Sequence, residues 1–132
     1  MAQFTPVVVL SRFAAMVLLI AQAVVLSIAA EFKVITALEI GSGKSTAIIA
    51  DAIKRNHKDY SSFVKNNLRK NNAFEVHSVE TNQQWADKVE SSLQPELKPY
   101  VHMTVVGCRM ATFNSRICTL FNNFPNRFVS YS

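Results

Sequence analysis

The chain of 132 residues is poor in the residues that mark several classes of protein. It has three glycines, four prolines and two cysteines, and only 17% of its residues are charged. So little glycine and proline excludes a collagen-like chain, and the low charge excludes a long coiled coil and a disordered chain. Two cysteines and three scattered histidines do not form the ligand spacing of a zinc site, so we predict no metal. The length suits one small domain.

An uncharged apolar run is what the chain has in excess. Residues 13–30 are interrupted only by Gln22 and Ser27, and Arg12 precedes them. This pattern is typical of a secretory signal peptide with small residues placed for cleavage after Ala29. A signal anchor is the alternative, because a helix of this length reaches about 27 Å and a hydrocarbon core is ~30 Å thick. A buried core helix is disfavoured, because the run is apolar on every face.

Both interpretations of the apolar run place the same part of the chain outside the cytoplasm, because positive charge stays on the inner side. We therefore expect residues 1–30 to be a signal peptide or anchor and residues 31–132 to be a secreted, extracellular domain, tethered to a membrane only if the leader is not cleaved. In an oxidising compartment Cys108 and Cys118 are expected to form a disulfide. Such a short closed loop would stabilise the fold by roughly 2.5 to 3 kcal/mol. Two buried reduced thiols are the alternative.

The apolar pattern of residues 31–132 predicts alternating strands and helices. Thr81 and Gln84 form a capping box that would begin the last helix. Residues 111–123 fit neither pattern well. We expect an α+β fold in a single small domain, with a mixed sheet of about four strands packed with about three helices. The expected strands are 32–37, 74–80, 100–106 and 127–131, and the expected helices are two that follow Ser45 and break near 56–59, and one over 81–93.

A glycine-containing turn follows the first predicted strand. Residues 38–46, LEIGSGKST, resemble the Walker A loop of P-loop nucleotide-binding proteins at Gly43, Lys44 and Ser45, and Gly41 lies where many transporter-type ATPases also carry glycine. The resemblance implies that backbone amides at a helix start hold phosphate, that Lys44 meets the outer phosphates, and that Ser45 binds a magnesium ion.

The same segment departs from the P-loop pattern at one position and lacks a partner elsewhere. Leu38 replaces the first glycine of the pattern. The best later strand, residues 100–106, runs into Gly107 and Cys108, so we expect no strand that ends in an acid able to serve as the Walker B aspartate. A Gly-Ser-Gly turn with Ser45 capping a helix is the simpler interpretation.

Two histidines occupy predicted strands. Alternation places Glu75 and His77 on one face of the first strand, and Tyr100 and His102 on one face of the second. If the strands pair with these faces matched, two imidazoles, a carboxylate and a phenol converge, and Arg109 is near in sequence. Such a set could supply the base, acid and cation of metal-free RNA cleavage, and small secreted ribonucleases use similar groups. Half-exposed polar strand residues are the alternative.

Positive charge is concentrated in two parts of the chain. Removal of Arg12 with the leader leaves 13 of the 14 basic residues against 9 acidic ones. Residues 54–70 are mainly basic, although His57 is expected to be solvated, and residues 97–132 contain no acid at all. Such surfaces attract nucleic acid, anionic lipid or acidic proteins, and they also keep a domain soluble.

The leading functional hypothesis combines the leader, the small domain and the basic surface. Its plan resembles that of small secreted effector or toxin-like proteins, and we expect an extracellular binding module without a cofactor whose partner is a protein, nucleic acid or lipid outside the cell. A secreted metal-free ribonuclease that uses His77 and His102, and a degenerate P-loop nucleotide-binding protein, are the alternatives.

Overall fold

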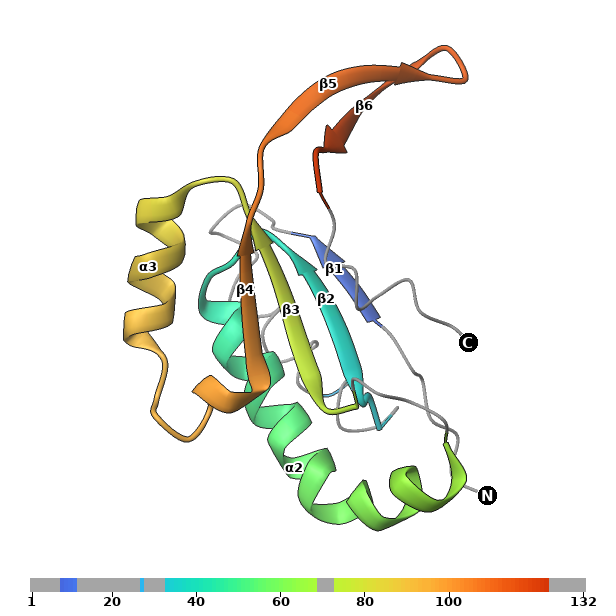
Figure 1. Ribbon diagram of the computed structural model, residues 1–132, viewed down its shortest axis with the longest axis vertical. Coiled ribbons are helices and arrows are strands. Elements are labelled where there is room, and N and C mark those ends of the chain that lie inside the picture. Colours follow the sequence, from blue (N-terminus) through green and yellow to red (C-terminus); the bar gives the residue numbers. More distant parts are fainter. Residues whose placement is uncertain (1–7, 12–26, 28–32, 69–72, 124–132) are drawn as a thin grey trace.

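A parallel β-sheet forms the centre of the computed structural model (Figure 1), which describes residues 8–11, 27, 33–68 and 73–123. The strands lie side by side in chain order, and every neighbouring pair is parallel. The α+β content and the approximate number of elements are as expected, but this sheet is parallel where a mixed one was predicted. Its four strands are β1 (Val8–Ser11), β2 (Thr36–Ile40), β3 (Glu75–Glu80) and β4 (Val101–Val105).

Helices connect the parallel strands, as parallel pairing requires. Helix α2 (Lys44–Asn67) joins β2 to β3, and helix α3 (Gln83–Ser92) with the 3-10 turn η2 (Lys98–Tyr100) joins β3 to β4. The predicted break near residues 56–59 is wrong, because α2 is one continuous helix. Asn56 does not end it: this side chain is buried, and its Nδ2 donates to the carbonyl of Val34 at 2.8 Å.

The start of α3 also differs from its prediction. Asn82 is the N-cap, and its side chain accepts a hydrogen bond from the backbone N–H of Trp85 at 3.0 Å. Thr81 was predicted to cap the helix, but its own N–H donates to the Glu80 carboxylate at 2.9 Å. The helix therefore begins one residue later than a capping box on Thr81 would place it.

The two faces of the sheet carry different hydrophobic clusters. On the face covered by α2, Ala37 and Val76 pack against Ile49 and Ile53 of the helix. On the other face the smaller cluster contains Leu38, Val79, Val106 and the partly buried Phe121. Polar side chains are also buried in this small domain, and such groups are stable only when hydrogen-bonded. They are Thr36, Glu39, Ser42, Thr46, Asn56, His77, Ser78 and Glu80.

A two-stranded antiparallel hairpin, β5 (Cys108–Phe113) and β6 (Arg116–Phe121), extends beyond the end of β4 (Figure 1). Residues 108–121 are called the arm below. The predicted disulfide is absent, since Cys108 and Cys118 are both free thiols. The register pairs Cys108 with Phe121 and Cys118 with Ala111. The two cysteines are thus three residue pairs apart, about 10 Å along the ribbon, whereas a bridge needs Cα atoms within about 7 Å.

Some predictions fall on residues that the structure does not describe. Residues 1–7, 12–26 and 28–32 contain most of the predicted signal peptide or anchor, and the predicted strand 127–131 also lies outside the described residues. Residues 8–11 of the predicted leader form β1, which pairs with β2. Among the described residues, none of the helices combines the length and apolar character that crossing a bilayer requires. Cleavage after Ala29 and export stay predictions.

Candidate functional site

The carboxyl ends of β2 and β3 lie next to each other, and a loop leaves each of them toward a helix. In open parallel sheets this edge is where ligands bind. The first loop begins at Gly41, whose φ of 84° is a conformation that glycine adopts without strain. Its N–H donates to the carbonyl of Val79 at 2.8 Å, which ties the loop to the neighbouring strand. Two buried glutamates, one near or at the end of each strand, organise the rest of this edge.

Glu39 on β2 is only 2% exposed. Its carboxylate accepts hydrogen bonds from the hydroxyls of Ser45, Thr46 (2.6 Å) and Ser78 (2.6 Å). Burial raises the pKa of Glu39, the nearby Glu80 carboxylate raises it further, and the three hydroxyl donors only partly oppose this. These bonds join β2 to the first turn of α2 and to β3.

Glu80, the last residue of β3, accepts hydrogen bonds on both carboxylate oxygens. Oε2 accepts from the N–H and the hydroxyl of Ser42, each at 3.0 Å, and Oε1 accepts from the N–H groups of Thr81 and Asn82 at 2.9 and 3.3 Å. Burial by itself raises the pKa of Glu80, but the hydrogen bonds from these three residues outweigh it and lower the pKa overall. An ionised carboxylate is therefore held against the glycine-containing turn.

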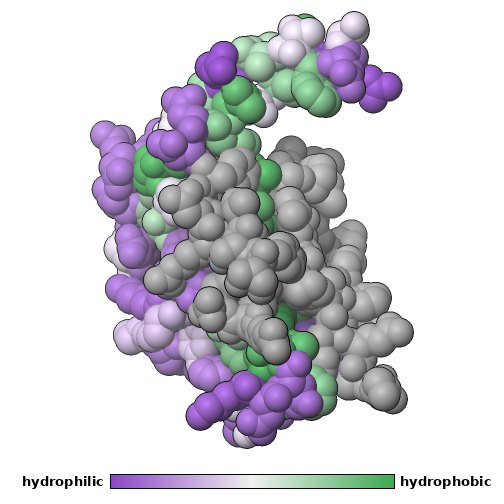
Figure 2. Space-filling view, turned by 45° about the vertical axis from the view of Figure 1, so that its right-hand side comes forward, coloured by the Kyte–Doolittle hydropathy of each residue, from purple (hydrophilic) through white to green (hydrophobic). Residues whose placement is uncertain are grey.

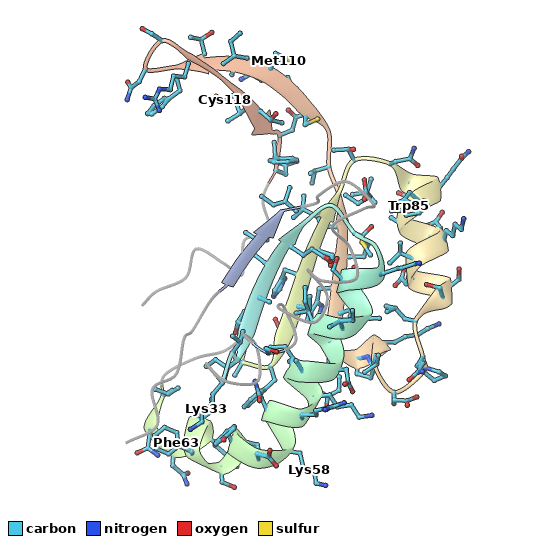
Figure 3. The ribbon with its side chains drawn as sticks, turned by 180° about the vertical axis from the view of Figure 1, so that it is seen from behind. Lys33, Lys58, Phe63, Trp85, Met110 and Cys118 are labelled. Carbon is cyan, nitrogen blue, oxygen red and sulfur yellow. The ribbon has the colours of Figure 1, made fainter. Side chains whose placement is uncertain are left out.

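Trp85 fixes the turn from a third direction. Its indole Nε1 donates to the carbonyl of Ser42 at 2.9 Å, across 43 residues of sequence. Figure 3 shows Trp85 on α3, beside the edge where α2 begins. Ser42 thus uses its N–H, hydroxyl and carbonyl in bonds to Glu80 and Trp85, so the turn, β3 and α3 form one hydrogen-bonded unit.

The predicted phosphate-binding residues lie on this edge, and one of them, Ser45, has its hydroxyl bonded to a carboxylate. Lys44 is the first residue of α2 and is exposed. The Ser45 hydroxyl, the predicted magnesium ligand, donates to Glu39, and the Gly43 N–H donates to the Thr46 hydroxyl at 3.0 Å. Strand β3 does end in an acid, Glu80, and whether an acid there serves as a Walker B residue stays a prediction. Two carboxylates at one loop repel a phosphate group.

Three of the four predicted catalytic residues come together on β3 and β4. The register pairs His77 with His102, their rings stack at 5.1 Å, and Glu75 lies 2.8 Å from His77 Nε2 and 3.5 Å from His102 Nε2. His77 is buried, whereas the His102 side chain is 39% exposed. The fourth residue, Arg109, is exposed on the arm.

The predicted phenol of Tyr100 belongs to a different contact. Its hydroxyl lies 3.0 Å from Nδ1 of His57, whose ring also stacks on Phe74 at 4.7 Å. His57 is exposed, as a solvated residue would be, yet it is held in place by both aromatic neighbours. Tyr100 therefore lies beside α2, and the cluster on β3 and β4 consists of Glu75, His77 and His102.

Sequence reasoning missed the two glutamates that organise the edge. Glu39 lies within the segment that was predicted as a glycine turn, and Glu80 is the last residue of a strand that alternation predicted. The sequence signal that could have identified them is an acid at or near the end of each of two strands. The direction and order of the strands, which bring Glu39 and Glu80 together, cannot be derived from local periodicity.

Comparison with known proteins gives no family for this arrangement. Within the part of the chain that the structure describes, no group of three or more His, Cys, Asp or Glu side chains is suited to hold a metal ion. No family model, no curated protein and no solved structure matches the chain.

Proposed function

We propose that the chain binds a nucleoside at the carboxyl ends of β2 and β3, with the ribose hydroxyls at Glu80. The observation that carries this proposal is the Glu80 carboxylate, which closes β3 and lies 3.0 Å from the N–H and hydroxyl of Ser42 in the adjacent turn. Nucleotide-binding α/β sheets share a local plan: a strand, a glycine turn, a helix and a parallel strand that ends in an acid. In those sheets the acid binds a ribose hydroxyl. This likeness is one of architecture.

The bonds of Glu80 suit an exchange with a ligand. The N–H groups of Thr81, Asn82 and Ser42 hold the carboxylate in position from the backbone. The fourth donor is the Ser42 hydroxyl, which rotates about a single bond. A ribose hydroxyl can replace it at Glu80 without loss of a hydrogen bond, and the charged acceptor makes that bond a strong one.

The charge of the site selects among nucleosides. Glu39 and Glu80 lie at the same turn, and the amide of Ser42 donates to a carboxylate. These features favour a neutral or positively charged nucleoside over a nucleoside triphosphate. In a P-loop, free backbone amides bind the phosphate, whereas here a phosphate would lie next to negatively charged carboxylates. Lys44 is exposed and has no part in the proposed ribose contact.

Isothermal titration calorimetry with four ligands tests the proposal: adenosine, 2′-deoxyadenosine, ATP and a sulfonium nucleoside such as S-adenosylmethionine. Adenosine and the sulfonium nucleoside should bind more tightly than ATP, and loss of the 2′-hydroxyl should weaken binding about tenfold or more. Because this comparison changes only the ligand, it does not depend on how a variant folds. Absence of heat with all four ligands, or tighter binding of ATP, contradicts the proposal.

Two variants separate the ribose interpretation from the phosphate one. Glu80→Gln should weaken adenosine binding by about tenfold to a hundredfold, the value of one hydrogen bond to a charged group. Lys44→Ala should leave adenosine binding unchanged, whereas a phosphate-binding loop would lose ATP with its lysine. Far-ultraviolet circular dichroism of each variant verifies the fold before titration.

A second candidate function rests on the cluster of Glu75, His77 and His102. A carboxylate between two imidazoles orients both rings, and the half-exposed His102 can exchange a proton with a bound substrate. This supports general acid-base chemistry such as RNA cleavage, although Arg109 lies on the arm and does not join the cluster. His102→Ala should abolish cleavage of a fluorogenic RNA while Arg109→Ala leaves it intact; equal activity of His102→Ala and the unaltered chain removes the idea.

A further inference from the structure

The arm exposes large hydrophobic side chains. Met110, Phe113 and Ile117 are 73%, 72% and 74% exposed, and Leu120 is 43% exposed. Figure 2 shows hydrophobic surface on the arm where it extends away from the rest of the molecule, and Figure 3 shows Met110 and Cys118 on it, far from the helices. Exposed apolar side chains gathered on one element mark an interaction surface.

Both faces of the arm carry apolar side chains. Residues that oppose each other in an antiparallel pair point to the same face, and the register pairs Thr112 with Ile117 and Phe113 with Arg116. One face therefore contains Met110 and Ile117, and the other contains Phe113 and, by the same alternation, Leu120. Phe113 and Leu120 share their face with Arg109 and Arg116, so this face of the arm is both apolar and basic.

Only the base of the arm is anchored in the described structure. Phe121 packs against the small cluster of Leu38, Val79 and Val106, and the Asn122 N–H donates to the carbonyl of Gly107 at 2.9 Å. An isolated two-stranded hairpin is marginally stable in water without further packing. The distal residues of the arm thus gain most from association with another surface.

The charges of the arm identify the kind of surface. Arg109 and Arg116 are exposed, and residues 97–132 contain no acid. Helix α3, which contacts β4 just before the arm begins, exposes Asp87 and Glu90 at helical spacing on its outer side. A basic, apolar arm and a helix with two exposed acids and one exposed lysine, Lys88, are therefore present on every molecule.

We propose that the arm docks onto α3 of a second copy of this chain, and that the second copy's arm docks in return on α3 of the first. This exchange is a closed twofold arrangement, which is the commonest form of homo-oligomer. Arm-to-arm pairing is disfavoured, because it would bring the arginines of two arms together. The arm and the two acids of α3 are complementary in charge, so the arm of each copy faces opposite charge on the helix of the other copy.

The size of the arm sets the strength of the association. Six residue pairs span about 20 Å, and two strands with their side chains are about 10 Å wide, so one face offers roughly 200 Å² of contact. Two arms and the two surfaces that they cover together bury about 800 Å². That is below the about 1,200 Å² of a stable specific interface and in the range of weak ones, so we expect a reversible dimer with a micromolar dissociation constant.

Sedimentation velocity of the 132-residue chain, from about 1 to about 300 μM, brackets the expected dissociation constant and tests the proposal. The unaltered chain should pass from monomer to dimer over this range. Replacing the apolar residues on the face that carries the arginines, with Phe113→Ser and Leu120→Ser, should weaken the dimer at least tenfold. The matched control is Phe63→Ser, which removes a 44% exposed phenyl ring from α2 and should leave association unchanged.

Charge reversal decides whether the arm meets α3 or another surface. The double variant Arg109→Glu and Arg116→Glu should weaken the dimer at least tenfold. Mixing it in equal amounts with the Asp87→Lys and Glu90→Lys variant should restore a heterodimer, because the altered arm then faces the altered helix and the unaltered arm faces the unaltered helix. Combining all four substitutions in one chain should restore the dimer, because both contacts regain opposite charges. A monomer at every concentration, a dimer insensitive to the arm variants, or no recovery in the fourfold variant overturns the proposal.

Discussion

Replacing Glu39 tests whether buried hydroxyl bonds at the edge of the sheet stabilise the fold. In Glu39→Ala the hydroxyls of Ser45, Thr46 and Ser78 lose their acceptor, and each buried donor left unsatisfied costs about 1 to 3 kcal/mol. Because hydroxyls can rotate toward other acceptors, we expect a total loss of about 3 to 6 kcal/mol in the free energy of unfolding. That is a large share of the about 5 to 15 kcal/mol that stabilise a domain.

Glu39→Gln keeps the shape and one carbonyl acceptor, so it should cost about 1 kcal/mol or less near neutral pH. The sign of the pH dependence follows from the pKa of Glu39, which burial raises above the ordinary 4.5. A raised pKa gives a stabilising contribution that is complete below pH 4.5 and is lost as pH rises through the pKa of the folded state. The Gln variant lacks this titration, so it should gain on the unaltered chain as pH rises.

Urea unfolding followed by circular dichroism, from about pH 4 to about pH 8, measures both effects. Glu90→Gln, an exposed change on α3, is the control and should leave the free energy of unfolding within about 0.5 kcal/mol. If Glu39→Gln is as destabilising as Glu39→Ala, or if its difference from the unaltered chain is the same at every pH, the reasoning about a buried, hydroxyl-bonded carboxyl group is refuted.

Four further outcomes are expected. Hydrogen bonds lower the pKa of Glu80, so its contribution is complete above pH 4.5 and lost as pH falls through the folded-state pKa; Glu80→Gln should flatten the acid side of the stability curve. Asn56→Ala should cost about 1 to 3 kcal/mol in urea unfolding, because it removes a buried hydrogen bond. Alkylation without reductant followed by mass spectrometry should modify both Cys108 and Cys118; a mass short of two hydrogens would contradict this. The mass of the chain recovered from culture medium should correspond to cleavage after Ala29, and an untrimmed chain dissolved in cytosol would rule out export.

The strands with strong alternation were predictable from sequence. Residues 74–80 and 100–106 alternate apolar and polar side chains, and β3 and β4 lie within them. The end of β2 was harder to place. Its strand was predicted at residues 32–37, yet it runs from Thr36 to Ile40, because pairing with β3 carries the ladder on to the glycine turn.

The remaining errors come from contacts between distant residues. The polar stretch near residues 56–59 is typical of a helix break, but Asn56 reaches the carbonyl of Val34 and lets α2 continue. A pair of cysteines in one short segment suggests a bridge, but the hairpin register separates Cys108 from Cys118. His77 and His102 come together because β3 pairs with β4. The alternation of apolar and polar residues is compatible with this pairing but does not determine it.

The single tryptophan of the chain is bonded to the turn that carries the proposed ligand site. Its indole N–H meets the carbonyl of Ser42, so a change in that turn alters the surroundings of the only indole that emits light. Fluorescence from Trp85 therefore reports on this turn without a second tryptophan to obscure it, and the protein needs no attached dye for its loop to be followed in solution.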